Sequence, residues 1–430
     1  MMYDRCIALI ESPALRQAKY KCVFSRKAIP RSMVFKRFLL FLQLFLVKND
    51  SMIDFLKMPS PCYVLDEELL DRNLATVDRV RRESGAEIIV ALKACAMWSI
   101  FPELAQHSDG ATASSAAEAR LVFEEFGKPA HTYAPTYTDR NIDEILRCSD
   151  HITFNSVSQF ERFGQRALIS GLSCGLRINP QYSPVETDLY NPCVPGSRLG
   201  VTAEQLAAFG GLPAGVEGLH FHVLCESRPE HLRKALEAVE RHFGHCLDQI
   251  KWLNMGGGHL MTASWYDCDE LIAVLKDFKA RHPHLRLILE PGSAFTWRTG
   301  YLVSTVEDIV ENGGVHTAML DVSFACHMPD CLEMPYKPAI VGAHDPAEGE
   351  KRWRMGGTSC LAGDFYGDWA FDHDLKVGER IVFEDMIHYT MVKTTMFNGV
   401  QHPAIVIARR DGRTDIIREF GYEDFRNRMS

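Results

Sequence analysis

The amino-acid sequence predicts an α/β protein in which a (β/α)8 barrel is followed by a C-terminal β-domain. Three observations support this fold class. The chain has 430 residues, which is too long for one ordinary core and indicates two domains. Residues 86–292 alternate short apolar runs with amphipathic stretches. Beyond residue 295 the segments become short and β-rich, separated by Gly, Pro and Asp turns.

The alternating region contains eight strand candidates. Strands that alternate with helices indicate a parallel sheet, and eight such units over roughly two hundred residues favour a closed barrel over an open doubly wound sheet. Helices are expected between the strands, including Pro229–Leu247 and Ala116–Phe126, the second opening on a capping box from Ser115 to Glu118. The strands start near Ile88, Gly110, His131, His151, Gly175, Gly218, Trp252 and Leu285.

The barrel is expected to span residues 67–295 and the β-domain residues 296–430, the latter as a sandwich or barrel. Residues 60–66 precede the barrel and are predicted to form a strand that joins the β-domain. Further strands are predicted at Tyr301–Val306, Val315–Asp321, Lys337–Val341, Arg380–Phe383, Tyr389–Val392 and Ala404–Arg409.

The first 51 residues differ from the rest of the chain. The apolar run Phe38–Val47 is about half as long as a membrane-spanning helix requires. Lys48-Asn49-Asp50 follows where a signal peptide would carry small residues. We therefore interpret residues 1–51 as an extension that is disordered or not native, with the functional chain starting near Met52.

Composition narrows the classes of partner. The formal net charge of -9 argues against binding of nucleic acid, and no membrane partner is expected. Thirteen cysteines without regular spacing favour reduced thiols and a cytoplasmic location. Cys326 and Cys331 flank His327, but no second Cys/His pair completes a tetrahedral zinc set, so no metal is expected.

Lys93 is the most informative residue, because it follows the apolar run Ile88–Leu92. At the end of a buried strand a lysine amine is desolvated, which favours its neutral, nucleophilic form. Such an amine can form a Schiff base with a carbonyl cofactor. A solvated lysine at a strand end is the ordinary alternative, so the other strand ends decide between the two.

Chemistry in a barrel collects at the carboxyl ends of the strands. The glycines found there let backbone N–H groups cradle an anion, unless they form only a flexible turn. Each histidine is either a site residue or a satisfied core residue, whereas an unpaired buried glutamate is rare. An amine, a flat imidazole, an anion cradle and a carboxylate together fit pyridoxal phosphate. The residues are Arg177, His220, His222, Gly256, Gly257, Gly258, Glu290 and Gly292.

In the second half of the chain, the segment from Gly356 to Asp364 combines small residues with a thiol and a carboxylate. Cys360 alone would be an ordinary core cysteine. A glycine-flanked loop, however, is where an exposed reactive thiol would lie.

These residues together resemble the fold-type III (alanine racemase-like) pyridoxal-phosphate-dependent decarboxylases, from about Pro61 to Tyr422. Within that group the sequence is most similar to the carboxynorspermidine (carboxyspermidine) decarboxylases, through the segments that begin at Leu320, Leu332 and Gly363. The shared motifs are Ala-Leu-Lys93-Ala, Phe-His222-Val, Gly256-Gly-Gly, Glu290-Pro-Gly, Thr-Ser-Cys360 and Tyr389-Thr.

The resemblance implies a role for each matching residue. Lys93 is similar to the Schiff-base lysine, His222 to the imidazole stacked on the cofactor ring, and Glu290 to the partner of the pyridine nitrogen. Gly256–Gly258 and Tyr389 resemble the phosphate contacts, and Arg177 and Gly292 are further cofactor-binding candidates.

The resemblance also implies a homodimer with shared active sites. Cys360 would protonate the carbanion from the other subunit, and Asp321 and Asp364 would bind the substrate's amines. Two departures stand out: Ser293 replaces the family's arginine after Glu-Pro-Gly, and Leu361 replaces the aspartate that follows the cysteine in ornithine decarboxylases.

The implied activity is decarboxylation of carboxynorspermidine or carboxyspermidine to norspermidine or spermidine in polyamine biosynthesis. The alternatives are a diaminopimelate or other basic amino-acid decarboxylase, and an amino-acid racemase on the same architecture. A non-catalytic regulatory homologue would be expected to have lost Lys93 or Cys360, and both are present.

Overall fold

The computed structural model describes residues 53–430. The interpretation of residues 1–51 as an extension therefore concerns residues outside the described part of the chain. Within the described part, no helix combines the length and the apolar character that a membrane span requires.

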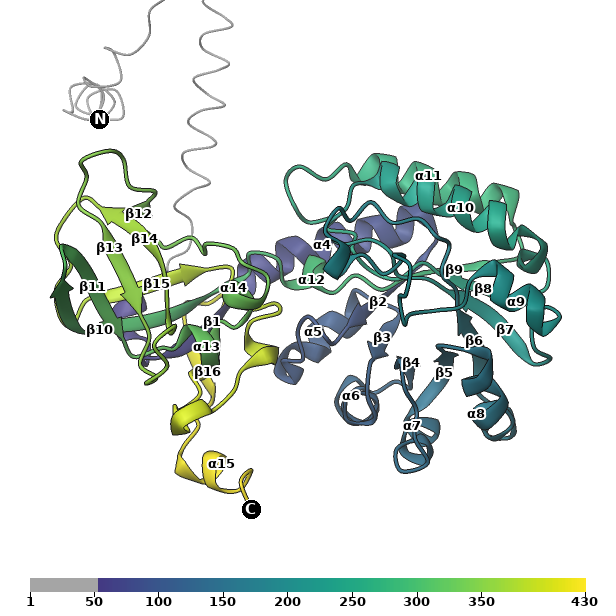
Figure 1. Cartoon of the computed structure of the whole chain (residues 1–430), viewed down its shortest axis with the longest axis horizontal. Coiled ribbons are helices and arrows are strands. Elements are labelled where there is room, and N and C mark those ends of the chain that lie inside the picture. Colours follow the sequence, from purple (N-terminus) through teal and green to yellow (C-terminus); the bar gives the residue numbers. More distant parts are fainter. Residues whose placement is uncertain (1–52) are drawn as a thin grey trace, which may run out of the picture. The chain divides into compact units, whose positions relative to one another are not determined.

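Eight parallel strands close into a barrel in chain order, from β2 to β9 (Figure 1). The ring closes where Glu87 pairs with Ile288 and Ile88 with Leu289. The eight predicted strands are confirmed, and the open doubly wound alternative is wrong. The strands are β2 (Glu87–Ala91), β3 (Gly110–Ala113), β4 (Ala130–Tyr133), β5 (Ser149–Phe154), β6 (Ser173–Arg177), β7 (Val216–His220), β8 (Trp252–Asn254) and β9 (Arg286–Leu289).

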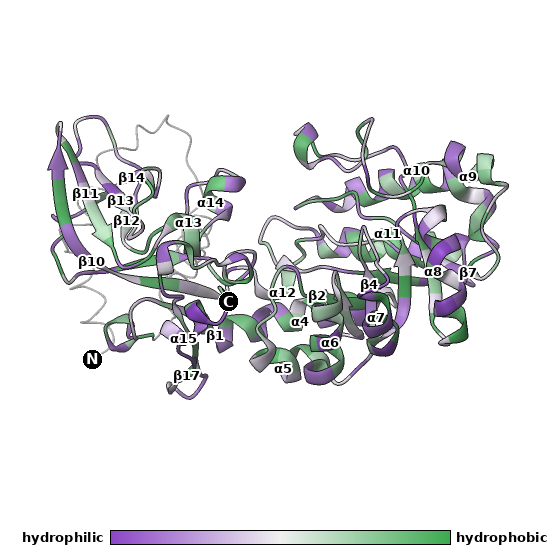
Figure 2. Ribbon diagram, turned by 60° about the horizontal axis from the view of Figure 1, so that its bottom comes forward, coloured by the Kyte–Doolittle hydropathy of each residue, from purple (hydrophilic) through white to green (hydrophobic). Residues whose placement is uncertain are grey.

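The helices between these strands carry both hydrophobic and hydrophilic residues (Figure 2). In α10 the buried residues recur every three or four positions, which gives the helix one apolar face. Its bounds, Pro229–Leu247, are those predicted. The others between strands are α5 (Phe101–Gln106), α6 (Ala116–Leu121), α7 (Ile142–Cys148), α8 (Val157–Ile169), α9 (Ala203–Phe209) and α11 (Cys268–Arg281), while α4 (Glu67–Ser84) precedes β2 and α12 (Ser293–Thr296) follows β9.

The helix predicted at Ala116–Phe126 is α-helical only as far as Leu121. A π-helical turn, η4 (Val122–Phe126), completes it. The predicted capping box is half formed. Ser115 Oγ accepts from the Glu118 amide, but the Glu118 carboxylate accepts from the amide of Ser114, one residue too early for a reciprocal bond.

Glycine on neighbouring barrel strands makes room for one large side chain. Trp252 lies inside the barrel with Ile89 and Ile288. A Cβ on Gly175 would lie 2.3 Å from the indole, and one on Gly218 only 2.0 Å from it. The two glycines therefore allow a tryptophan to fill the interior below the rim.

The β-domain is built on a nine-stranded sheet in the order β12-β14-β13-β11-β10-β1-β16-β17, with β15 also paired to β10. β1 lies between β10 and β16, so the segment that precedes the barrel is a strand of this sheet. The strands are β1 (Cys62–Asp66), β10 (Gly300–Asn312), β11 (Val315–Leu320), β12 (Ala343–His344), β13 (Trp353–Gly356), β14 (Phe365–Phe371), β15 (Arg380–Glu384), β16 (Ala404–Ala408) and β17 (Thr414–Arg418).

Two predicted strands of this region are wrong. In the segment 337–341 only Ile340 pairs, as a single bridge to Phe383. In the segment 389–392 the backbone turns at Tyr389, with φ of 52°, because its amide donates to the carbonyl of Ala94 in the barrel. The remaining short helices lie outside the strands in both halves of the chain. They are η2 (Phe55–Lys57), η3 (Trp98–Ile100), η5 (Asp188–Tyr190), η6 (Met391–Lys393), η7 (Phe397–Gly399), α13 (Phe324–His327), α14 (Asp330–Glu333) and α15 (Tyr422–Arg426).

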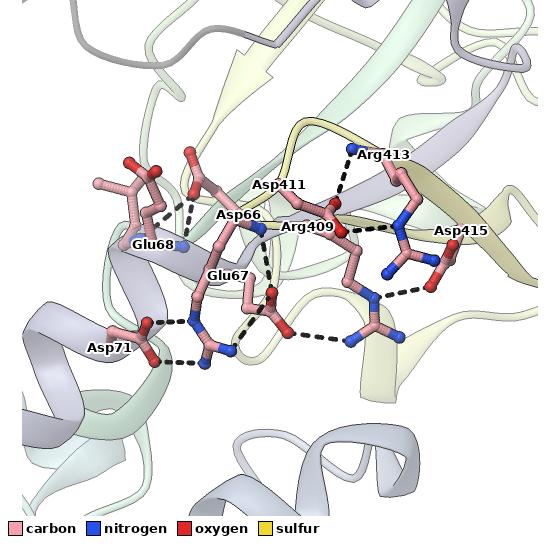
Figure 3. Close-up of polar contacts among 10 residues, drawn as sticks. Asp66, Glu67, Glu68, Asp71, Arg409, Asp411, Arg413 and Asp415 are labelled. Carbon is pink, nitrogen blue, oxygen red and sulfur yellow. Dashed lines mark hydrogen bonds and ion pairs between the residues drawn. The ribbon is translucent and has the colours of Figure 1, made fainter.

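A network of charged side chains joins the start of α4 to the loop between β16 and β17 (Figure 3). The buried carboxylate of Glu67 accepts from Arg409 Nη1 at 2.9 Å and from the backbone amide of Arg410 at 3.0 Å. Arg410 also forms a two-pronged pair with Asp71. Because α4 belongs to the barrel half, these interactions connect the β-domain to the barrel.

Candidate active site

Polar side chains lie where the barrel strands end. Arg177, His220 and Asn254 are the last residues of β6, β7 and β8, and Glu290 directly follows β9. Lys93 lies two residues beyond the end of β2. The carboxyl ends of parallel strands in a closed barrel meet at one rim, so these residues share one mouth.

Lys93 lies at this mouth with its Nζ 3.3 Å from Nε2 of His222. The side chain is solvent-accessible, yet protein atoms surround it, as in a concave site. Burial lowers the pKa of Lys93 below its usual range, and the charge of Glu290 opposes that shift only in part. The amine is therefore available as a neutral nucleophile more readily than a surface lysine.

The hydrogen bonds of His222 agree with a neutral amine at Lys93. Nδ1 of His222 accepts from the amide of Gly257 at 3.1 Å, so the ring carries its proton on Nε2. Nε2 then donates to Lys93, which requires a lone pair on the lysine nitrogen. Burial, with a smaller effect from the charge of Arg177, lowers the pKa of His222 well below its usual value.

Glu290 is ionised at this rim. Its Oε1 accepts from Asn254 Nδ2 at 2.7 Å, and its Oε2 lies 3.5 Å from His220 Nε2. Burial alone would raise the pKa of Glu290, but the contacts with His220 and Asn254 outweigh it and lower the pKa to about 2. Asn254 in turn accepts from the amide of Gly256 at 2.9 Å, which ties the carboxylate to the glycine loop.

The three consecutive glycines are packed against backbone. Gly256 and Gly258 have φ of 68° and 93°, a region that favours glycine. Gly292 is also closely packed, because its Cβ would lie 2.6 Å from that of Ala94. A Cβ on Gly256, Gly257 or Gly258 would lie 2.5, 2.4 or 2.3 Å from the carbonyl oxygen of Phe221, Glu290 or Leu224, respectively. The segment is thus a closely packed backbone loop beside His222 and Glu290.

Arg177 and Tyr389 complete the rim. Arg177 is buried, donates to the carbonyl of His222 at 3.1 Å and stacks its guanidinium on the ring of Tyr133 at 4.7 Å. Tyr389 reaches the rim from the β-domain, because its amide donates to Ala94, the neighbour of Lys93, at 2.8 Å. Burial raises the pKa of the Tyr389 hydroxyl, which stays protonated.

Cys360 lies in an exposed loop of the β-domain. Its amide and thiol lie 3.3 and 3.5 Å from Oδ1 of Asn398. The buried Asp364 closes the loop, since its carboxylate accepts from the amides of Ser359 and Ala325 at 3.0 and 3.1 Å. These bonds hold the thiol on a defined turn at the surface.

Asp321 also lies in the β-domain, where its carboxylate accepts from the hydroxyls of Ser60 and Ser304 and from the amide of Thr305, at 2.6–2.9 Å. Substrate binding by Asp321 or Asp364 stays a prediction, and both carboxylates already have protein donors. Within residues 53–430, no hydrogen bond or ion pair joins Cys360, Asp321 or Asp364 to the lysine rim.

Two groups bear on metal binding. His327, between the two cysteines considered for zinc, uses Nδ1 to accept from the amide of Ser323 at 3.1 Å. Among the described residues, His131, Asp150 and His151 have ligand atoms close together. The two imidazoles are stacked, with centroids 3.9 Å apart and planes 23° apart, so their in-plane lone pairs do not converge on one ion.

The sequence placed His220 at the rim but did not show its contact with Glu290, and it missed Asn254 and one acidic group. Asn254 looked like the end of a strand, and the contact of His220 with Glu290 depends on packing across the barrel. Asp330 and Glu333, on α14, both pair with the ammonium of Lys393. The signal for Asp330 was present, because it lies in the segment after Leu320 that carried the resemblance.

A closed parallel barrel with a nucleophilic lysine at its carboxyl rim, joined to a mixed β-sheet domain, is the architecture of the fold-type III enzymes. The family model described as "Pyridoxal-dependent decarboxylase, C-terminal sheet domain" matches residues 62–387.

The carboxyaminopropylagmatine decarboxylase of Synechocystis sp. is 56% identical over 372 residues, covering 86% of this chain and 96% of that protein. The carboxynorspermidine/carboxyspermidine decarboxylase of Campylobacter jejuni is 39% identical over 380 residues, covering 86% and 98%. A crystal structure of carboxynorspermidine decarboxylase from C. jejuni, complexed with norspermidine, superposes with a TM-score of 0.79 at 37% identity, covering 86% of this chain and all of that one.

The chain belongs to the pyridoxal-dependent decarboxylase family, and it is a decarboxylase of the group that serves polyamine biosynthesis.

Proposed function

We propose that the enzyme binds pyridoxal phosphate at the lysine rim and removes the α-carboxylate of a carboxylated polyamine as carbon dioxide. The hydrogen-bond chain from Gly257 through His222 to Lys93 carries the proposal. This hydrogen-bond chain favours a neutral, accessible amine on Lys93. An ionised glutamate, Glu290, lies at the same rim.

The residues present fit this cofactor. Lys93 would hold the aldehyde carbon, and the ring of His222 offers a flat apolar face. The packed loop Gly256–Gly258 and Tyr389 would hold the phosphate, with Arg177 and Gly292 supporting the rim. Glu290, being ionised, would hold a proton on the pyridine nitrogen. When bound, the cofactor supplies a conjugated ring that accepts the electron pair left on the α-carbon as carbon dioxide departs.

The protein's own residues then control charge and protons. Lys93, as a neutral amine, would hold the aldehyde carbon and give it up to the substrate's amino group without first losing a proton to water. Glu290 would keep a positive charge on the ring nitrogen, which would stabilise negative charge that develops on the α-carbon. Cys360 would deliver a proton to the α-carbon, as its thiol lies on an exposed, glycine-flanked turn.

A homodimer would bring that thiol to the partner's rim. In this chain no hydrogen bond joins Cys360 to the lysine rim within residues 53–430, so a second copy is the natural source. Large apolar side chains surround the loop at the surface: Leu361, Phe365 and Phe397 are 46%, 43% and 51% exposed. Such a patch favours burial against another protein surface.

The acidic pair Asp330 and Glu333 supports a cationic substrate. Both carboxylates pair with the ammonium of Lys393, so a substrate amine would take the place of that lysine between them. The charge of Asp330 also acts on Tyr389, the β-domain residue that reaches the lysine rim.

Two kinds of substrate fit this class. The 56% relative acts on carboxyaminopropylagmatine, which ends in a guanidinium group, and the higher identity favours this substrate. The 39% relative acts on carboxynorspermidine and carboxyspermidine, which end in an ammonium group and remain the second candidate.

The experiment is a carbon dioxide release assay with carboxyaminopropylagmatine, carboxynorspermidine, carboxyspermidine, diaminopimelate and ornithine, each at the same concentration. We expect release from one or more of the first three, and release only from the last two would refute the proposal. A Cys360→Ala variant tests the proton donor. It should lose most of its rate of amine formation, and an undiminished rate would refute that role.

Cysteines support a reducing compartment for the enzyme. The eleven cysteines of the described residues are all free, and eight of those thiols have a pKa raised by burial. We place the enzyme in the cytoplasm on this ground.

A further inference from the structure

His220 is a buried histidine for which the proposed chemistry gives no task. It is the last residue of β7 and is 1% exposed. Within the described part of the chain, Nδ1 has no hydrogen-bond partner, and Nε2 has only a long contact with Glu290. A buried imidazole with an unpaired nitrogen costs free energy, and its place at a reaction site points to a ligand-dependent role.

The ring of His220 is held in place by stacking. It packs on the ring of Tyr133, with centroids 5.1 Å apart and planes 27° apart. Tyr133 is fixed by its hydroxyl, which donates to Asn155 at 2.9 Å, and by the guanidinium of Arg177 over its ring. The position of His220 therefore does not depend on its own hydrogen bonds.

In this position, Nε2 of His220 is directed at one carboxylate oxygen of Glu290. Nε2 of His220 lies 3.5 Å from Oε2 of Glu290, whereas Asn254 occupies Oε1. Oε2 would therefore be the oxygen more available to the cofactor's pyridine nitrogen. His220 is the protein group that shares it.

We propose that His220 is a positioning residue that keeps the proton shared by Glu290 and the pyridine ring on the ring nitrogen. This rests on the proposed function, because it needs pyridoxal phosphate at the rim. An N–H directed at Oε2 stabilises the carboxylate form of Glu290 and not its protonated form. The pair is then biased toward carboxylate and pyridinium, the arrangement in which the ring accepts electrons best.

Other charges face His220 and set the background for the same equilibrium. Arg177 from β6 and Lys93 beyond β2 act on His220 directly. His131 from β4 acts on Glu290. None of the three contacts Oε2 of Glu290 by a hydrogen bond in the described residues. Of these four side chains, His220 is therefore the one that contacts Oε2 of Glu290.

The test replaces His220 by phenylalanine, which keeps the stack on Tyr133 and removes the donor. The ¹⁵N chemical shift of the ring nitrogen is measured in holoenzyme loaded with ¹⁵N-labelled pyridoxal phosphate. We expect the shift to move toward that of a neutral pyridine. The turnover number should fall roughly 3- to 10-fold, the factor expected for one hydrogen bond, with KM within about twofold of wild type.

Two further variants make the result specific. His220→Gln retains an N–H donor and should recover part of the pyridinium signal. His151→Phe removes another buried barrel histidine with an unpartnered Nε2, one that does not contact Glu290, and should leave the shift unchanged.

An unmoved ring-nitrogen shift in His220→Phe overturns the inference, provided that thermal unfolding shows the variant folded. If that variant does not fold, His220→Gln decides, and a shift equal to that of a neutral pyridine overturns the inference. Failure of the wild-type protein to bind pyridoxal phosphate would instead refute the proposed function.

Discussion

Gly257 offers the sharpest test of how the rim is built. Its φ is not in the left-handed region, so an alanine there is strained only by contact. The new Cβ would lie 2.4 Å from the carbonyl oxygen of Glu290. Ordinary contact needs about 1 Å more, so the ends of β8 and β9 would have to separate. That separation would also pull the Gly257 amide away from His222.

Overpacking of this kind costs about 1–3 kcal/mol. We expect Gly257→Ala to lower the free energy of unfolding of the apo-protein by that amount, measured by urea denaturation. We also expect at least tenfold weaker binding of pyridoxal phosphate, which is about 1.4 kcal/mol, measured by absorbance titration. The displaced groups, His222 and Glu290, are the ones proposed to hold the cofactor.

Gly110→Ala is the matched control. Gly110 is the first residue of the barrel strand β3 and, like Gly257, has no positive φ, but its Cβ would contact only Ile89 Cγ2 at 3.6 Å. The free energy of unfolding of Gly110→Ala should therefore lie within about 1 kcal/mol of that of wild type. If Gly257→Ala matched Gly110→Ala in both stability and cofactor affinity, the packed-loop reasoning would be refuted.

Three other predictions follow from the charged groups. Glu67→Gln should lower the free energy of unfolding by about 2 kcal/mol, because Arg409 and the Arg410 amide lose a charged acceptor; Glu68→Gln, at an exposed position, should change it by less than about 0.5 kcal/mol. Equal urea midpoints for the two would contradict this. The pKa of Glu290 falls from 4.5 to about 2 on folding, so ionised Glu290 adds about 3 kcal/mol to the free energy of unfolding. This contribution is complete above pH 4.5 and is lost as the pH falls toward 2. The excess stability of wild type over Glu290→Gln should shrink in that window, and a constant difference would be evidence against an ionised Glu290. Lys93→Met should raise the urea midpoint of the apo-protein at pH 7, since folding desolvates the amine, and a lower midpoint would argue against it.

The barrel could be predicted from sequence because its strands are buried on both faces. β2 and β9 give short apolar runs, and the polar residue beyond each run marks the rim. The positions of Lys93, Arg177 and Glu290 follow from this rule alone. Chain order then places them at one mouth.

The contacts within the rim could not be predicted, because they depend on packing across the barrel. Strand alternation put His220 and His222 on one face, but it did not show that His220 approaches Glu290 while His222 contacts Lys93. Nor did it show that Asn254 connects Glu290 to the glycine loop.

The β-domain was harder to predict for a related reason. Several of its strands are partly exposed, so their patterns are weak. β13, β14 and β17 were missed: β13 is short and mostly buried, β14 changes from exposed to buried along its length, and β17 alternates exposed and half-buried residues. Tyr389 lies in a run that favours a strand, but one bond to Ala94 turns the backbone there.

The central claim is that the amine of Lys93 forms the covalent link to pyridoxal phosphate. The most direct measurement is borohydride reduction of the holoenzyme, followed by digestion and mass spectrometry of its peptides. Our account predicts a pyridoxyl group on the peptide that contains Lys93, and none on that peptide in Lys93→Ala. A pyridoxyl group on a different lysine of the wild-type enzyme, with Lys93 unmodified, would contradict it.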